Sequence, residues 1–265
     1  MATTTPKQWA LITGAGSGIG QALAHTMADH GYGIILMGRR RGPLKTTESQ
    51  ILSQHPRART LILNTDITQQ SAIAQAVMGI GRYLDSNGAI LTHLVHCAGT
   101  GAPESSSLES STKELKQALA VNAVAPLALT QQLLALLRQS GQGRVMFLGA
   151  GMDEKVQPGT GPYGISKMAL KRLFRQLLVD REHHPHPNNP ALIFYQPGMV
   201  DTPGLRQHAE LAAQLSLPHA SFLQQALEEG TAMPVAEAAR RMASLLENKN
   251  RAEIDGKEWH GRNVD

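Results

Sequence analysis

The chain has 265 residues, of which 42% are hydrophobic and 17% are charged; this composition excludes a disordered chain and is sufficient for one large α/β domain. The single cysteine excludes an internal disulfide, which favours a reducing and therefore cytoplasmic compartment. The net charge of +4 is scattered, no apolar run approaches the length of a membrane span, and the first eight residues lack the apolar core of a signal peptide, so we expect no nucleic-acid partner and no membrane.

The first informative stretch is a run of glycines between two apolar segments. Residues 9–12 are typical of a short buried strand, and residues 22–28 are typical of a helix. Between them, Gly14, Gly18 and Gly20 form a Gly-x3-Gly-x-Gly arrangement, which differs from the dinucleotide fingerprint Gly-x-Gly-x-x-Gly. A strand, a tight turn and a helix N-terminus together predict a seat for a phosphate group. The alternative is an ordinary glycine-rich turn without a ligand.

The second apolar segment, residues 33–38, ends in Arg39-Arg40-Arg41. In nucleotide-binding βαβ units, an acidic residue about 20 positions after the glycines binds the ribose 2′-hydroxyl of NAD, whereas an arginine suits the 2′-phosphate of NADP. Arg39 lies 19 residues after Gly20. The sequence therefore favours NADP(H) over NAD(H) as the cofactor; the alternative is a solvated basic loop.

The rest of the chain continues to alternate between strands and helices. Residues 43–54 predict a helix, residues 60–63 predict a strand leading into Asp66 and Ile67, and Thr68 is expected to cap a helix that reaches about residue 84. Further strands are predicted at residues 93–97, 144–148 and 191–195, and further helices at residues 113–139, 162–181, 205–229 and 235–247, with a polar end at 251–265 that lacks a long core strand. This alternation predicts a single α/β domain, residues 1–265, with a doubly wound parallel sheet and helices on both faces.

Tyr163 and Lys167 are the second informative feature. They lie four residues apart in a predicted helix, on one face and one turn from each other. A lysine cation beside a phenol favours the phenolate and lowers the pKa of the tyrosine, which suits proton transfer near neutral pH. Such pairs are common, and the position of this pair after the fifth strand of a nucleotide-binding sheet makes it a candidate catalytic pair.

Together these motifs resemble those of the classical short-chain dehydrogenase/reductase family, over residues 9 to about 202. The matching residues, in order, are Thr13-Gly14, Gly18-Ile19-Gly20, Asp66-Ile67, Ala98-Gly99, Asn122, Tyr163, Ser166-Lys167 and Pro197-Gly198-Met199-Val200-Asp201-Thr202. The resemblance implies a Rossmann-like fold. It also implies an oxidoreductase that moves a hydride between a nicotinamide and a small-molecule carbonyl or alcohol substrate, without a metal.

The resemblance further implies roles for single residues. Tyr163 would transfer the proton, Lys167 would bind the nicotinamide ribose and adjust Tyr163, and Asn122 would hold a water that relays protons to the lysine. The implied cofactor-binding residues are Gly14, Ser17, Gly18 and Ile19 at the pyrophosphate, with Gly20 in the same turn; Asp66 and Ile67 at the adenine; Ala98 and Gly99 at the adjoining ribose; and Pro197, Gly198, Val200 and Thr202 at the nicotinamide. The sequence supports Asn122 independently, because Pro126 supplies no N–H to its carbonyl; a helix kink without function is the alternative.

Two positions depart from the family pattern. The family places a serine thirteen residues before the tyrosine to hold the substrate oxygen, and this chain has Ala150 there. Losing one such donor commonly lowers the rate about 10²–10³-fold, so a water replaces it, the substrate needs little help, or catalysis is weak. Met152 has no hydroxyl, and Thr160 is expected to lie too far along the loop. His96-Cys97 replaces two asparagines and is expected to be structural, with a reactive Cys97 as the alternative.

The segment after Thr202 determines the substrate in this family, and residues 203–230 are expected to form a helical substrate lid. Its histidines, His208 and His219, either touch the substrate or face solvent, and solvent is the expectation. The histidine- and proline-rich residues 183–187 are expected to form a surface loop rather than a metal site. Residues 201–202, 245–247 and 255–256 are weakly similar to those of sepiapterin reductase and benzil reductase.

The helices predicted at residues 113–139 and 162–181 are apolar on more than one face, which exceeds what packing on one sheet requires. The residues concerned are Leu133, Leu134, Leu136, Leu137, Leu173, Phe174, Leu177 and Leu178. The family associates through the equivalent helices. The resemblance therefore implies a homodimer or homotetramer.

Three hypotheses for function follow. The first is an NADP(H)-dependent carbonyl reductase with Tyr163 as the proton donor. The second is a cofactor-binding scaffold or sensor with weak or no turnover, which Ala150 motivates and the joint presence of Asn122, Tyr163 and Lys167 argues against. The third, a purely structural α/β domain, leaves the glycine cluster unexplained.

Overall fold

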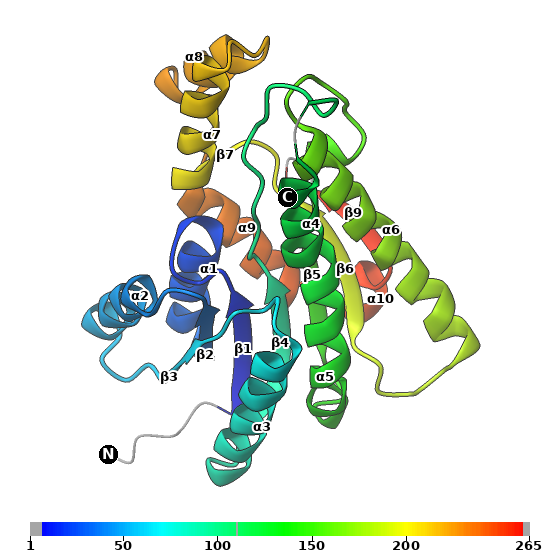
Figure 1. The fold of residues 1–265 in the computed structure, drawn as a ribbon. Helices are drawn as coiled ribbons and strands as arrows, with labels where there is room; N and C mark the ends of the chain where they lie inside the picture. Colours follow the sequence, from blue (N-terminus) through cyan, green and yellow to red (C-terminus); the bar gives the residue numbers. More distant parts are fainter. Residues whose placement is uncertain (1–6, 110, 262–265) are drawn as a thin grey trace.

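A parallel sheet of seven strands forms the centre of the computed structural model, which describes residues 7–109 and 111–261 (Figure 1). Most of the N-terminal segment that we expect to lack a signal peptide, and the last residues of the polar C-terminal stretch, lie outside the described residues. The strands are β1 (Gln8–Thr13), β2 (Gly33–Gly38), β3 (Thr60–Asn64), β4 (Ile90–His96), β5 (Arg144–Leu148), β6 (Ala191–Gln196) and β9 (Lys257–His260), in the order β3-β2-β1-β4-β5-β6-β9. Every neighbouring pair is parallel, which confirms the predicted Rossmann-like, doubly wound α/β fold.

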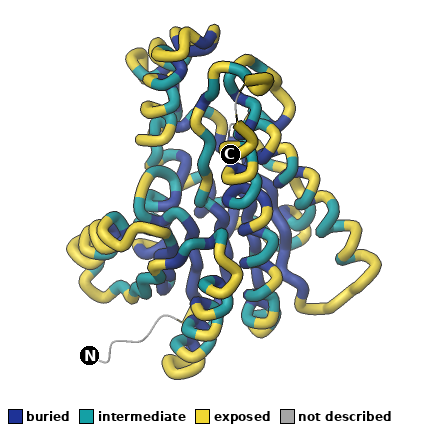
Figure 2. Tube along the Cα trace, viewed as in Figure 1, coloured by how far each residue is buried: buried dark blue, intermediate teal, exposed yellow. Residues whose placement is uncertain are grey.

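Helices cover both faces of this sheet. One layer contains α1 (Gly18–Asp29), α2 (Arg41–Gln54) and α9 (Val235–Glu247), and the other contains α3 (Gln70–Ser86), α5 (Ala125–Gln139) and α6 (Gly161–His183) (Figure 1). Each layer packs its own apolar cluster against the strands. The central strands are covered on both sides and are therefore almost continuously apolar. Figure 2 shows them as the buried centre of the domain.

The seventh strand, β9, is not predicted by the sequence. It follows the short helix α10 (Arg251–Ile254) and pairs in parallel with β6 at the edge of the sheet. Its residues, Lys-Glu-Trp-His, contain no apolar run, and most of them are exposed. Among the described residues, the expectation that this end of the chain lacks a long core strand holds. Pairing with β6 nevertheless adds a short polar edge strand to the six strands expected from the sequence.

Thr68 does not cap a helix, contrary to the expectation. The helix α3 begins at Gln70, with Gln69 as the N-cap residue and no side-chain capping bond. The Thr68 hydroxyl donates to Asp66 Oδ1 at 2.7 Å, and the Thr68 N–H donates to the same oxygen at 3.0 Å. The aspartate therefore organises a local turn that uses the hydroxyl and competes with helix capping.

The helix predicted at residues 113–139 contains a wide turn. It consists of α4 (Thr112–Leu119), the π-helical turn η1 (Ala120–Val124) and then α5. The π-turn lies directly before Pro126 in α5, and this proline supplies no N–H to the preceding turn. Single π-turns are frequent at functional sites, and this one contains Asn122.

Among the described residues, one helical stretch, Thr112–Gln139, is long and apolar enough to cross a membrane. Of its apolar window, 44% is buried inside the protein. Leu129, Leu133 and Leu137 pack in the core on one face of the sheet. Core helices commonly meet the same criteria of length and composition, so packing on the sheet accounts for the apolar character of this stretch.

Residues 203–230 form a helical arm that projects beyond the carboxyl edge of the sheet (Figure 1). The arm contains α7 (Pro203–Gln214) and α8 (Ala220–Glu228). At its base, β7 (Val200–Asp201) pairs in parallel with β8 (Met233–Pro234). A small apolar cluster, separate from the two main cores, holds the two helices of the arm together.

Two buried histidines on β4 predict that the protein loses stability in mild acid. Burial, and then the charge of Arg144, lowers the pKa of His93 to about 4, and burial lowers the pKa of His96 to about 3. Because the folded pKa values lie below the unfolded value near 6.5, this stability is complete above pH 6.5 and is lost as the pH falls toward the folded values. Each histidine should lower the free energy of unfolding by about 2 kcal/mol at pH 5 relative to pH 7.5.

Urea unfolding at the two pH values measures this loss. The variant His96→Gln should lose roughly half of the pH dependence, because glutamine does not titrate. The exposed His183→Gln is the matched control. Equal pH dependence in wild type and His96→Gln would contradict the prediction.

Candidate active site

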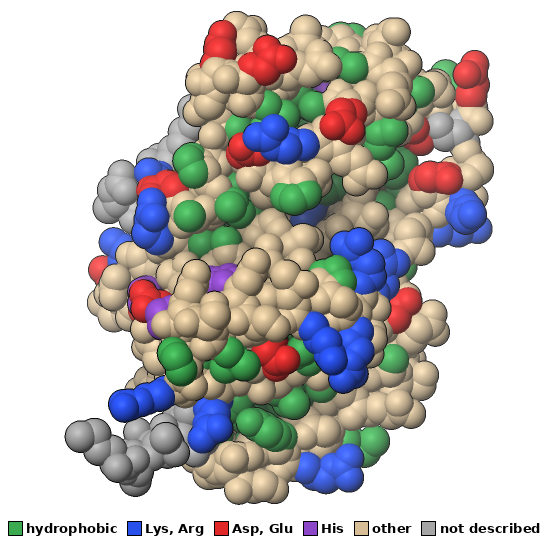
Figure 3. Space-filling view, turned by 90° about the vertical axis from the view of Figure 1, so that its left-hand side faces the viewer, with side chains coloured by type: hydrophobic (Ala, Val, Ile, Leu, Met, Phe, Trp, Pro, Cys, Tyr) green, Lys and Arg blue, Asp and Glu red, His purple; other side chains and the backbone are tan. Residues whose placement is uncertain are grey.

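The predicted motifs meet at one edge of the sheet. The strands β1 and β4 are neighbours, yet the chain leaves β1 toward β2 on one side and leaves β4 toward β5 on the other. Connections that diverge in this way leave a crevice at the carboxyl ends of the strands. Figure 3 shows this side of the molecule hollowed between the helical arm and the body of the domain.

The glycine turn is held against the end of β4. Thr13 Oγ1 accepts a hydrogen bond from the N–H of Ala98 at 3.0 Å. Gly14 has a φ of +66°, and a Cβ on it would lie 2.9 Å from Ala98 Cα. A Cβ on Gly20 would lie 2.6 Å from the Gly14 carbonyl oxygen. Both positions therefore require glycine, and the turn has the close backbone packing that the sequence predicts.

The N-terminus of α1 is open at this turn. Ser17 is the N-cap residue, and its exposed side chain makes no capping bond. The N–H of Gln21 bonds to the Ser17 carbonyl, so the N–H groups of Gly18, Ile19 and Gly20 precede the first helical bond. These groups, with the positive end of the helix dipole, suit an anion such as a pyrophosphate.

Arg39, Asp66 and Ile67 follow the ends of β2 and β3, next to the glycine turn. The N–H of Thr68, then its hydroxyl and more weakly the charge of Arg39, lower the pKa of Asp66. Ile67 is buried. The carbonyl of Arg39 accepts a hydrogen bond from Asn64 Nδ2 at 2.8 Å, while the Arg39 side chain is exposed. The basic end of β2 and the acidic end of β3 therefore lie side by side.

The side chain of Asn122 connects three elements. Its Oδ1 accepts the N–H of Thr100 at 2.9 Å, and its Nδ2 donates to the Thr100 carbonyl at 2.7 Å and to Ser166 Oγ at 2.8 Å. Ser166 in turn donates to the carbonyl of Tyr163 at 2.7 Å. The π-turn is thus tied to the loop after β4 and to the first turns of α6. The free carbonyl inferred from Pro126 stays a prediction.

Lys167 is buried beside Tyr163. Its Nζ donates to the Leu148 carbonyl at 2.8 Å and lies 5.7 Å from the centre of the Tyr163 ring. A Cβ on Gly99 would lie 3.9 Å from this Nζ, so the loop after β4 closes the same space. Burial lowers the pKa of Lys167 to about 8. Burial, and then the charge of Asp153, raises the pKa of Tyr163 to about 12. The expectation of a lowered tyrosine pKa is therefore wrong for this arrangement, because burial and the charge of Asp153 both disfavour the phenolate.

No hydroxyl replaces the family serine among the residues that the sequence offers. Ala150 itself has no donor. Thr160 Oγ1 donates to the Gln157 carbonyl at 2.8 Å, and Met152 Sδ lies 3.3 Å from Gln157 Nε2. Ser166 bonds within α6, as described above. The two hydroxyls, on Thr160 and Ser166, therefore already donate to backbone carbonyls.

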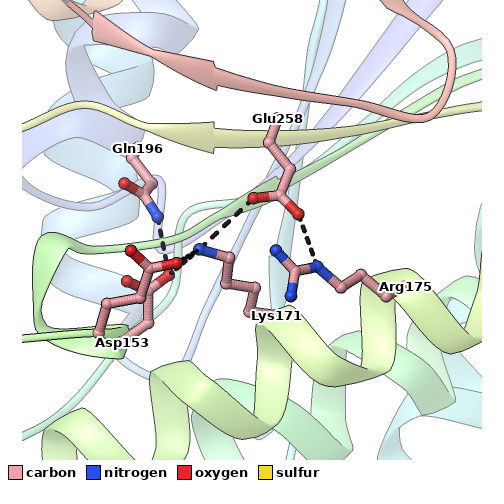
Figure 4. Close-up of polar contacts among 6 residues, drawn as sticks. Asp153, Lys171, Arg175, Gln196 and Glu258 are labelled. Atoms are coloured by element: carbon pink, nitrogen blue, oxygen red, sulfur yellow. Dashed lines mark hydrogen bonds and ion pairs between the residues drawn. The ribbon is translucent and has the colours of Figure 1, made fainter.

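A buried ionic network fixes the loop after β5, which contains the short 3-10 helix η2 (Gly151–Asp153) (Figure 4). Asp153 is only 2% exposed. Its Oδ2 accepts a hydrogen bond from Gln196 Nε2 at 2.7 Å and lies 3.5 Å from Lys171 Nζ. Burial raises the pKa of Asp153, although the charge of Lys171 opposes this shift.

The same network reaches the edge strand β9. Lys171 Nζ lies 3.4 Å from Glu258 Oε2, and Arg175 Nε donates to Glu258 Oε1 at 2.7 Å (Figure 4). The network thereby joins the loop after β5 to α6, β6 and β9. The sequence does not predict this network, since its residues lie far apart in the chain and no local spacing connects them.

The segment after β6 returns to the glycine turn. Pro197 is buried, Gly198 is exposed with a φ of +82°, and Val200 is buried in the β7–β8 pair. Thr202 caps α7, with its Oγ1 accepting the N–H of Leu205 at 3.1 Å. A Cβ on Gly18 would lie 3.5 Å from Thr202 Cβ. The structure therefore brings the base of the arm to the N-terminus of α1.

The pair His96-Cys97 is part of the packing. His96 Nε2 lies 2.9 Å from Thr130 Oγ1, and its ring stacks on Phe147 with 5.1 Å between ring centres. Burial raises the pKa of Cys97 to about 12. A thiol with such a pKa stays protonated, which fits the structural interpretation rather than a reactive Cys97.

The histidines of the arm do not face solvent, contrary to the expectation. His219 is 8% exposed, His208 is partly buried, and their Nε2 atoms lie 3.2 Å apart.

Comparisons with known proteins agree with this geometry. A family model described as short chain dehydrogenase matches residues 8–211. Gluconate 5-dehydrogenase of Gluconobacter oxydans is 27% identical over 176 residues, which cover 66% of each chain. The NADPH-dependent reductase BacG of Bacillus subtilis is 23% identical over 262 residues, which cover 95% of each chain. The match to a very-long-chain 3-oxoacyl-CoA reductase of Coccidioides immitis covers 66% of this chain but 49% of that protein, so the chain spans half to two thirds of the length of some relatives.

Solved structures have the same fold. YwfH, described as an NADPH-dependent reductase, superposes with a TM-score of 0.80 at 18% identity over 96% of both chains. An NAD⁺-bound xylitol dehydrogenase superposes with a TM-score of 0.82 at 21% identity over 97% of this chain and 98% of that one. At these identities the likeness establishes the architecture. With the family match over residues 8–211, it follows that the chain belongs to the short-chain dehydrogenase family of oxidoreductases.

Proposed function

We propose that this chain is an NADP(H)-dependent carbonyl reductase in which Tyr163 donates the proton. The observation that carries the proposal is the grouping of Asn122, Tyr163 and Lys167 at the carboxyl edge of the sheet, across from the open N-terminus of α1. Membership of an oxidoreductase family supports a small-molecule carbonyl or alcohol as the substrate. The reductive direction and the preference for NADP(H) are parts of the proposal.

The residues of the glycine turn fit a dinucleotide. The N–H groups at the start of α1 and the hydroxyl of Ser17 would hold its pyrophosphate. They are available for this role because the Ser17 side chain makes no capping bond to these N–H groups. Asp66 and Ile67 would border the adenine. Ala98, which packs against the turn, and Gly99, which follows it, would border the adjoining ribose. The absence of a Cβ at Gly14 is what allows this close approach.

The nicotinamide end of the cofactor would lie under the base of the arm. Pro197, Gly198, Val200 and Thr202 would border the ring there, because Thr202 reaches the start of α1. This placement is supported by the contact between Thr202 and Gly18, which joins the two ends of the proposed site.

Arg39 carries the proposed preference for NADP(H). It is exposed at the end of β2, where an acidic residue would instead select NAD. The names of an NADPH-dependent reductase among the relatives and of structures solved with NADP support this choice. An NAD⁺-bound xylitol dehydrogenase has the same fold, so the preference depends on this side chain and not on the architecture.

Tyr163 is protonated at neutral pH, because burial raises its pKa to about 12. It is therefore an acid, as reduction of a carbonyl requires. When bound, the reduced nicotinamide supplies a hydride to the carbonyl carbon. Tyr163 supplies the proton to the carbonyl oxygen, and the phenolate that remains is stabilised by the nearby ammonium of Lys167 until a proton returns from solvent. Asn122 fixes the backbone of Tyr163 through Ser166 and would hold the relay water.

A second candidate function is favoured by Ala150. A scaffold or sensor would need the nucleotide seat but not rapid turnover, and Ala150 leaves the substrate oxygen without the family's hydroxyl donor. The ionic network nevertheless holds the loop after β5 in place through Asp153. An ordered loop is expected in an enzyme whose substrate-binding geometry is maintained, so the reductase is the first candidate.

The proposal extends to the role of the arm, the oligomeric state and the location of the protein. The helical arm, residues 203–230, would act as the substrate lid of the single domain. Exposed apolar side chains on the outer face of α6, namely Ile165, Met168 and Val179, support assembly as a homodimer or homotetramer. The presence of a single cysteine in the sequence supports a cytoplasmic location.

Tyr163→Phe should lower kcat about 10²–10⁴-fold, the usual contribution of a general acid. NADPH consumption is followed spectrophotometrically with diketones, quinones and pterins. Tyr83→Phe, on α3 and away from the site, is the control. NADPH binding should be unchanged in both variants, and equal turnover in Tyr163→Phe and wild type would remove Tyr163 from the mechanism.

Ala150→Ser should raise kcat/KM about 10²-fold, because it restores the missing hydrogen-bond donor to the substrate oxygen. Gly151→Ser is the matched control: a Cβ on Gly151 meets nothing within 4 Å, so a hydroxyl one position further along is tolerated sterically. The same assay measures both variants. No gain in Ala150→Ser would show that the native site does not lack this donor.

Arg39→Asp should lower kcat/KM for NADPH about 10²-fold, since it removes a charge-assisted contact to the 2′-phosphate and adds repulsion. The kcat/KM for NADH should be unchanged or should rise. Arg57→Asp, exposed before β3 at the opposite edge of the sheet, is the control. A parallel loss with both cofactors would contradict a role in selecting NADPH.

A further inference from the structure

The two histidines of the arm form a polar pair beneath its helices. His208 lies on α7, His219 caps α8, and their Nε2 atoms are 3.2 Å apart. One imidazole must donate and the other must accept across this distance, so the pair shares one proton. The second ring nitrogen of His219, Nδ1, is buried and has no hydrogen-bond partner among the described residues. A buried polar atom without a partner in a folded protein requires an explanation.

The pair lies above the two loops that border Tyr163. Against the lowering effect of burial, the backbone of Gly101, in the loop after β4, raises the pKa of His208 and so acts on this ring. A Cβ on Gly101 would lie 2.4 Å from Tyr163 Cδ2, so this loop rests directly on the tyrosine ring. On the other side, Leu217 of the arm contacts the loop before α6, since a Cβ on Gly159 would lie 2.3 Å from Leu217 Cδ1. The arm and Tyr163 therefore border the same loop, the one after β4.

The groups around the pair are basic. The charge of Lys155, from the loop after β5, acts on His219, and the two histidines act on each other. No carboxylate of the described chain shifts the pKa of either ring. Glu104, on the same loop as Gly101, accepts a hydrogen bond from Ser107 and lies against Gly161 at the start of α6. Among the described residues, the charged groups that act on the pair are therefore the two imidazoles themselves and the ammonium of Lys155.

We propose that His208, His219 and Lys155 bind the carboxylate of the substrate, so that the substrate is a keto acid whose carbonyl lies at Tyr163. This inference rests on the proposed function and names its substrate class. A carboxylate oxygen accepts a hydrogen bond from His219 Nδ1, which then has the partner it lacks. The anion also favours a second proton on the pair, and it balances the charge of Lys155.

The proposal implies that carboxylate binding takes up protons. In the protein without a carboxylate, burial and the neighbouring positive charges lower the pKa values of both histidines. A bound anion raises them, so affinity should fall as the pH rises from 6 to 8. Calorimetry in buffers of different ionisation enthalpy measures the number of protons taken up.

The central experiment compares 2-, 3-, 4- and 5-oxo acids with their methyl esters in the NADPH assay, using wild type, His208→Gln, His219→Asn and Lys155→Met. Glutamine and asparagine keep a hydrogen-bonding group at the relevant ring nitrogen but carry no charge. For the best oxo acid, His219→Asn should lower kcat/KM at least about tenfold, the effect of losing one charge-assisted hydrogen bond. The corresponding ester should change less than about twofold.

Controls separate this role from a structural one. Lys7→Met, exposed at the opposite edge of the sheet, should affect neither substrate. The thermal midpoint of each variant shows whether the arm still folds, and Lys155→Met, at an exposed position, tests the site without disturbing the core. Equal kcat/KM for acid and ester in wild type, or equal loss of both in His219→Asn and Lys155→Met, would overturn the proposal.

Failure of the proposed function is recognisable separately. If no carbonyl compound consumes NADPH, the reductase assignment fails, and calorimetric titration of the oxo acids into the NADPH-saturated protein still tests the carboxylate site. Binding with proton uptake in wild type, lost in His219→Asn and Lys155→Met, supports the site. An absence of binding by every oxo acid overturns it.

Discussion

One side-chain amide holds the candidate site together. Asn122 presents an acceptor and two donors in a fixed plane, and the loop after β4 and the hydroxyl of Ser166 match this pattern. An aspartate at this position lacks the donors, and an apolar residue leaves the backbone of Thr100 without these partners. Because Ser166 passes the constraint to Tyr163, the position of the tyrosine depends on a residue more than forty positions earlier.

Burial, more than neighbouring charge, sets the protonation states in the site. Lys167 lies over the ring of Tyr163, yet its ammonium bonds to a backbone carbonyl and the phenol keeps a high pKa. The same competition acts on Asp153, whose pKa burial raises despite the proximity of Lys171. Buried charges of this kind persist because other groups hydrogen-bond to them, which is how Gln196 and Glu258 keep the loop after β5 in place.

The sequence predicts the parts of the fold that local patterns specify. Strands covered on both faces are continuous apolar runs, and a turn as tight as the one at Gly14 tolerates no Cβ, so both leave strong local signals. Features decided by tertiary contacts are missed. The polar strand β9 forms because it can pair with the free edge of β6. The hydroxyl of Thr68 donates to Asp66 and does not cap a helix.

The candidate site divides in the same way. Its motif residues could be identified from spacing, but their electrostatics could not. The pKa of Tyr163 depends on how deeply the folded chain buries it, and neighbours in sequence do not determine that depth. Helical periodicity does not reveal that α7 and the start of α8 turn toward each other. For this reason the sequence wrongly predicts that the arm histidines face solvent.

The edge strand β9 has a consequence for how the protein is made. Residues from Gly14 to Gln196 leave the ribosome first, and Glu258 follows roughly 3–12 seconds later at ordinary rates of translation. Until then, Lys171 and Arg175 lack the carboxylate that joins α6 to the far edge of the sheet. The part of a nascent chain that contains the glycine turn is therefore complete before the residue that supports the loop after β5, and the two parts mature in sequence.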